Sequence, residues 1–110
     1  MAPRIVSYAE FWPYYLREHS RPATRAVHYL GTTLVLLCGI AVMVTGALWL
    51  VGVMVVVGYA PAWFGHAALQ KNRPATFRYP LWSLISDFRM YGAWITGRLG
   101  AELGKAGVDT

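Results

Sequence analysis

Three histidines are the residues in this sequence best suited to chemistry, because imidazole is the commonest metal ligand and titrates near neutral pH. They are His19, His28 and His66, and the sequence contains no others. Thr24 lies one helical turn before His28, and Gln70 lies one turn after His66, so each can share a helix face with its histidine. Taken together, these residues predict a metal-binding or proton-transfer site.

The other side chains indicate which metal ions such a site would bind. Cys38 is the single cysteine and lies inside an apolar run, which excludes a disulfide framework and a cysteine-rich zinc site within one chain. Neutral nitrogen ligands without a thiolate suit iron, zinc, copper or nickel better than calcium or magnesium. Asp87 can support such a site from the last helix, or it can form an ion pair with a neighbouring arginine. Taken singly, each histidine can also simply hydrogen-bond a backbone carbonyl or a lipid headgroup.

An uncharged stretch, residues 26–70, must position these histidines. It exceeds the roughly 20 apolar residues that span a bilayer and is long enough for two crossings. We therefore predict an all-α membrane protein with one helical domain over residues 1–110. Its antiparallel transmembrane hairpin has helices at about 22–44 and 47–70, joined at Thr45 and Gly46. A short interfacial helix at about 7–19 precedes it, and an amphipathic or third membrane helix at about 80–103 follows.

Connectivity alone brings the histidines together in such a hairpin. His28 near the start of the first crossing and His66 near the end of the second come to similar depth on one side of the membrane, and His19 lies just outside that level. Positive residues flank this open end, and such residues stay on the cytoplasmic side of membranes. These residues are Arg17, Arg21, Arg25, Lys71, Arg73 and Arg78.

We therefore predict an integral protein of the inner, cytoplasmic membrane with both hairpin ends and the histidines on the cytosolic side. The same placement explains the net charge of +5 as residues flanking membrane segments. We accordingly expect no binding to nucleic acid. The small residues of the two crossings would also allow close packing against a second copy of the chain, as in a homo-oligomer.

Four segments of the chain resemble a known family. The sequence between Phe11 and Leu99 is similar to the small membrane family of 2-hydroxy fatty acid dioxygenases, known from fungal phytosphingosine degradation and from short bacterial members. The resemblance rests on the ordered combination of these motifs. They are His19-Ser-Arg-Pro-Ala-Thr-Arg25-Ala-Val-His28-Tyr-Leu-Gly31, Gly65-His66-Ala-Ala-Leu-Gln-Lys71-Asn72-Arg73-Pro74-Ala75, Pro80-Leu-Trp-Ser83 and Asp87-Phe-Arg89-Met90.

The resemblance implies an Fe(II)-dependent α-oxidation in which a long-chain 2-hydroxy fatty acid and dioxygen give the acid shortened by one carbon, without 2-oxoglutarate. It implies that His19, His28 and His66 are both the metal ligands and the catalytic residues. The substrate-binding candidates are the polar residues near the open end, and the supporting candidates are Thr24 and Asp87. The substrate-binding set is Arg21, Arg25, Gln70, Lys71, Asn72 and Arg73. Two positions depart from the family pattern, which usually has Glu at Gln70 and Asn at Thr24.

Two other functions remain open from the residues themselves. His28 and His66 on antiparallel helices can serve as paired axial ligands of a haem in an electron-transfer protein, although this interpretation has no use for His19. The chain can also be a non-enzymatic, lipid-binding membrane hairpin, in which the histidines are dispensable.

Overall fold

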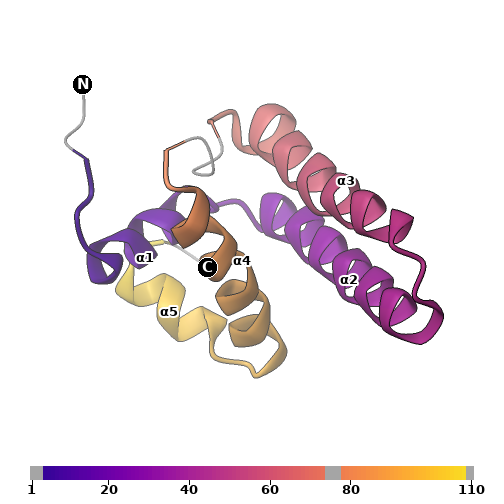
Figure 1. Ribbon diagram of the computed structural model, residues 1–110. Helices are drawn as coiled ribbons and strands as arrows, with labels where there is room; N and C mark the ends of the chain where they lie inside the picture. The colour runs from indigo at the N-terminus through magenta and orange to yellow at the C-terminus, as the bar shows by residue number, and fades with distance from the viewer. Residues whose placement is uncertain (1–3, 74–77, 109–110) are drawn as a thin grey trace. The chain divides into compact units, whose positions relative to one another are not determined.

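The computed structural model describes residues 4–73 and 78–108, and in this part of the chain the regular elements are all helices (Figure 1). The all-α prediction is confirmed. Pro74 and Ala75 of the second family motif lie outside the described residues. The elements in chain order are α1 (Tyr8–Arg17), α2 (Pro22–Thr45), α3 (Trp49–Phe64), the π-helix η1 (Gly65–Gln70), α4 (Pro80–Ile95) and α5 (Leu99–Lys105).

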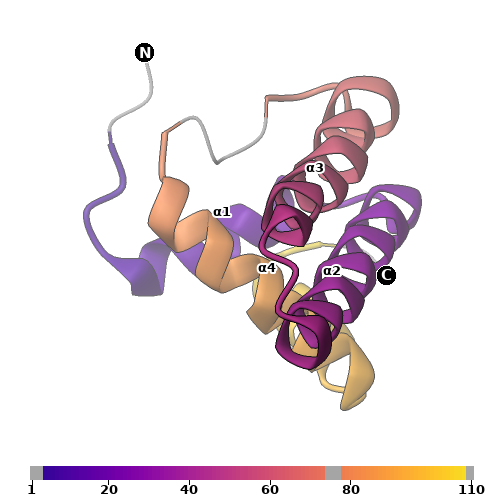
Figure 2. The ribbon, with the colours of Figure 1, turned by 45° about the vertical axis from the view of Figure 1, so that its right-hand side comes forward.

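Helices α2 and α3 form the predicted antiparallel hairpin and lie side by side along their lengths (Figures 1 and 2). Gly46 ends α2 in the left-handed conformation at φ 69°, a geometry that glycine adopts without steric cost. By length and composition, Pro22–Thr45 and Trp49–Gln70 can each cross a membrane. Only 11% and 17% of their apolar windows are buried, so these helices present apolar side chains outward, as a lipid environment requires.

Small residues allow the two hairpin helices to approach closely. A methyl group on Gly31 would lie 3.1 Å from the carbonyl oxygen of Val57 and 3.2 Å from that of Gly58. Pro61 lies inside α3 and has no amide hydrogen to donate to Val57, so it leaves that carbonyl outside the helical ladder. Glycine at position 31 therefore allows α2 to lie close to this turn of α3.

A second group of helices, α1, α4 and α5, is built around aromatic side chains. Phe11 is fully buried, with its ring centroid 5.2 Å from that of Tyr79 and 5.6 Å from that of Trp82. The hydroxyl groups of Tyr8 and Ser86 form a hydrogen bond with an oxygen–oxygen distance of 2.9 Å. Ser7 precedes the first helix as its N-cap, and its hydroxyl accepts a hydrogen bond from the backbone N–H of Glu10.

The last helical segment differs from the prediction of one helix at about 80–103. The structure has two helices there, because α4 ends at Ile95 and α5 begins at Leu99. Gly97 adopts φ 76°, which is incompatible with a continuous right-handed helix, and the Thr96 hydroxyl bonds back to the carbonyl of Gly92. The helical break is therefore local to the residues between Ile95 and Leu99.

The described chain divides into two compact units. The hairpin unit, Arg21–Arg73, contains α2, α3 and η1 and carries His28 and His66. The aromatic unit contains α1, α4 and α5 and carries His19.

Candidate metal centre

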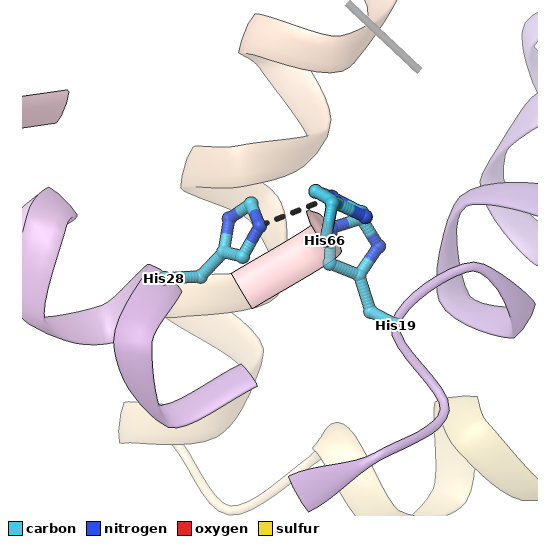
Figure 3. Close-up of side chains that lie close together, drawn as sticks. All are labelled: His19, His28 and His66. Atoms are coloured by element: carbon cyan, nitrogen blue, oxygen red, sulfur yellow. Dashed lines mark hydrogen bonds between the residues drawn. The ribbon is translucent and has the colours of Figure 1, made fainter. Parts of the chain in front are cut away.

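The imidazole rings of His28 and His66 meet inside the hairpin unit. His28 extends from α2 and His66 from η1, and their Nε2 atoms lie 3.3 Å apart (Figure 3). Both residues are buried, at 6% and 1% exposed. The predicted convergence of these two histidines is therefore present as direct contact between their rings.

The distance between the two Nε2 atoms suits a shared metal ion. Two imidazole nitrogens bound at 2.0–2.1 Å with a tetrahedral angle between them lie about 3.3 Å apart. The same distance also suits a hydrogen bond when one of the two Nε2 atoms carries a proton. His28 and His66 thus fit the donor set of iron, zinc, copper or nickel.

The π-helix η1 places the outer edge of the His66 ring against Asn72. The Nδ1 atom of His66 lies 2.6 Å from the Oδ1 atom of Asn72. Between them the chain turns through Lys71, which adopts φ 59° and ψ 45°, a left-handed conformation uncommon outside glycine. π-Helical turns and residues held in such conformations are frequent at functional sites.

Thr24 contributes a buried hydroxyl group on the same side of the hairpin. It is fully buried, one turn before His28, and a methyl group on Gly65 would lie 3.4 Å from its Cγ2 atom. Within the described residues its Oγ1 atom has no hydrogen-bond partner. An unpaired buried hydroxyl costs about 1–3 kcal/mol, so this group is available to a ligand.

His19 follows α1 in the aromatic unit and is 1% exposed. Its Nδ1 atom lies 2.6 Å from the backbone carbonyl oxygen of Tyr15, and the two side-chain rings stack with centroids 4.1 Å apart. The carbonyl can only accept, so Nδ1 donates and Nε2 keeps its lone pair for a metal. Each of the three histidines therefore offers a buried ring nitrogen that could bind a metal ion.

Tyr15 is a residue that the sequence analysis missed. Besides accepting from His19, it donates a hydrogen bond from its hydroxyl to Oδ1 of Asp87. The available signal was its position four residues before His19, which places both on one face of the helix predicted at about 7–19. Burial raises the pKa of Asp87 to about 6, although the Tyr15 hydrogen bond acts in the opposite direction. Tyr15 thus connects Asp87 to His19, through its hydroxyl on one side and its backbone carbonyl on the other.

The residues predicted to bind substrate lie in different settings. Arg21, Lys71 and Arg73 are exposed, whereas Arg25 is 7% exposed. The Oε1 atom of Gln70 accepts the backbone N–H of Arg21 at 3.0 Å, and so joins the end of η1 to the start of α2. A glutamate here, as the family usually has, would keep that acceptor and add a charge.

A model of one protein family matches this chain. The family model described as 2-hydroxy-palmitic acid dioxygenase Mpo1-like matches residues 5–99. No curated protein and no solved structure matches the chain. The matched segment contains all three histidines, Thr24, Asn72 and Asp87.

Proposed function

This chain belongs to the 2-hydroxy-palmitic acid dioxygenase Mpo1-like family, and from this membership we propose that it is an iron(II)-dependent enzyme of lipid α-oxidation. It converts a long-chain 2-hydroxy fatty acid and dioxygen to the fatty acid one carbon shorter. The observation that carries the proposal is the buried pair of His28 and His66 Nε2 atoms, 3.3 Å apart.

The stoichiometry of this reaction needs no further reductant. Oxidising the hydroxyl-bearing carbon to a carboxyl group removes three electrons, and releasing the old carboxyl carbon as carbon dioxide removes one more. One dioxygen accepts these four electrons, and water is the remaining product. A co-substrate such as 2-oxoglutarate is therefore unnecessary.

His19 is the proposed third ligand. Only Ser20 separates it from the hairpin unit, so its Cα atom lies within about 7.6 Å of that of Arg21 by chain connectivity alone. Arg21 in turn bonds through its backbone to Gln70, at the end of the helix that carries His66. Iron(II) held by three neutral nitrogens would supply redox chemistry with dioxygen and Lewis acidity toward a hydroxy-carboxylate.

The chain's own residues supply substrate recognition in this proposal. The Thr24 hydroxyl, which has no hydrogen-bond partner among the described residues, donates to an oxygen of the substrate head group. This hydrogen bond removes the energetic cost of burying an unpaired hydroxyl. The exposed cations Arg21, Lys71 and Arg73 attract the carboxylate, and charge-assisted hydrogen bonds are the strong ones. The acyl tail lies along the apolar surface of the hairpin, within the bilayer.

The proposed location follows from the same charges. The open end of the hairpin faces the cytosol, and the chain resides in the cytoplasmic membrane, because the turn around Gly46 carries no charge while cations flank the opposite end. Substrate then reaches the histidines from the membrane without passing through water.

To test the proposal, iron content and turnover are measured on the same preparation. Protein purified anaerobically with Fe(II) should hold stoichiometric iron, consume oxygen with a 2-hydroxy long-chain acid, and release the acid one carbon shorter. A non-hydroxylated acid of equal length and a zinc-loaded sample should consume none. Absence of bound iron, or a haem absorption band in the purified protein, would overturn the proposal.

A further inference from the structure

We propose that Asn72 is a positioning residue that holds the proton of His66 on Nδ1 and thereby presents Nε2 as the ligand atom. The inference rests on the proposed function only in taking this histidine as a metal ligand. It gives Asn72 a role directed at the protein's own imidazole, distinct from the substrate contact predicted from sequence.

A single proton lies between the side chains of His66 and Asn72. A neutral imidazole has one N–H donor and one acceptor nitrogen, whereas an amide oxygen only accepts. With Oδ1 of Asn72 at 2.6 Å, the His66 proton is therefore on Nδ1. Nε2 is left with its lone pair, and this is the nitrogen that faces His28 (Figure 3).

The backbone turn at Lys71 brings Asn72 to the His66 ring. The carbonyl oxygen of His66 accepts from the backbone N–H of Lys71 and, at 2.9 Å, from that of Asn72. Asn72 thus binds His66 twice, once through its main chain and once through its side chain. This arrangement requires the left-handed Lys71, since a continued helix would carry Asn72 away from the ring.

His19 uses the same chemistry with a different partner. Its Nδ1 atom donates to the backbone carbonyl of Tyr15 at 2.6 Å, so its Nε2 is also left unprotonated. Two histidines in separate units therefore each have Nδ1 committed to an oxygen acceptor. Metal-ligating histidines almost always donate their second N–H in this way, and losing that partner typically costs 10–100-fold in metal affinity.

The experiment reads the tautomer directly in metal-free protein. Full-length protein with ¹⁵N-labelled histidine is studied by NMR in detergent micelles at pH 8, above the ordinary imidazole pKa of about 6.5. The expected spectrum shows His66 with its proton on Nδ1. In Asn72→Ala this signal should change to a mixture of tautomers, whereas Asn72→Asp should keep the Nδ1 proton because a carboxylate also accepts.

Gln70→Ala is the matched control, because Gln70 lies in the same segment as Asn72 and its amide oxygen accepts from the backbone N–H of Arg21. It should leave the His66 tautomer unchanged. Cobalt(II), followed by its absorption bands, then measures metal affinity. Asn72→Ala should bind it 10–100-fold more weakly and Asn72→Asp should recover most of the loss.

Three results would overturn the inference: a wild-type His66 protonated on Nε2, a tautomer unchanged in Asn72→Ala, or equal cobalt affinity in all variants. Its failure is separable from that of the proposed function. A tautomer that follows residue 72 in a protein without dioxygenase activity would sustain the role of Asn72 and reject the enzyme.

Discussion

The Nε2 atoms of His28 and His66 lie 3.3 Å apart although the residues are 38 positions apart in the chain. The tight turn after Thr45 returns α3 along α2, and His66, in the π-helix η1, then meets His28 near the start of α2. These two rings are in direct contact and both are buried.

His28→Ala and His66→Ala should each lower iron affinity by more than the 10–100-fold expected for losing a partner of a ligand, because each removes a metal bond outright. Circular dichroism should stay helical, since α2 and α3 pack mainly through other residues. Iron content after dialysis against a weak chelator gives the measurement. Retention of full iron in either variant would show that the metal binds elsewhere.

Thr24→Val should stabilise the substrate-free protein and weaken substrate binding. Valine has the same shape but lacks the hydroxyl that is buried without a partner in the described structure, so removing it should gain about 1–3 kcal/mol. KM for the hydroxy acid should rise severalfold in the same variant. Thr24→Ser keeps the hydroxyl and is the control for KM. Loss of stability in Thr24→Val would mean that the hydroxyl already has a structural partner.

Asp87 should make stability depend on pH in the acidic range. Its folded pKa of about 6 lies above the ordinary 3.8, so the folded chain keeps a proton that the unfolded chain loses between these values. Stability should therefore fall as pH rises from about 4 to 6, by up to about 3 kcal/mol, and then level off.

Asp87→Asn should remove this slope, because the amide does not titrate and its oxygen still accepts from Tyr15. Denaturant unfolding in micelles at a series of pH values compares the two proteins. An equal slope in both would assign the pH dependence to another group.

Gly31→Ala should destabilise the hairpin by about 1–3 kcal/mol, because the new methyl group meets two backbone carbonyls that cannot rotate away. Gly52→Ala is the matched control in the facing helix, since nothing lies within 4 Å of the methyl group it would add. It should be neutral or stabilising by up to about 1 kcal/mol, as alanine favours helix over glycine. Thermal unfolding followed by circular dichroism separates the two outcomes.

Much of the fold could be predicted because it depends on local chain properties. An uncharged run of 45 residues with one glycine turn favours a helical hairpin in lipid, because helices satisfy their own backbone hydrogen bonds. The observed ends of α2, Pro22 and Thr45, lie close to the predicted ends of the first crossing. The break near Gly97 was missed, since the apolar pattern continues across it and a single glycine is tolerated within helices.

The sequence by itself determined which residues are available: three histidines, their depth in an antiparallel hairpin, the charges at its open end and the family motifs. These follow from composition and connectivity. Only the tertiary structure decided how the rings are used. The rotation of His66 toward His28, the Lys71 turn that brings Asn72 to His66, and the link from Tyr15 to Asp87 depend on helix packing and on backbone angles that residue spacing does not encode.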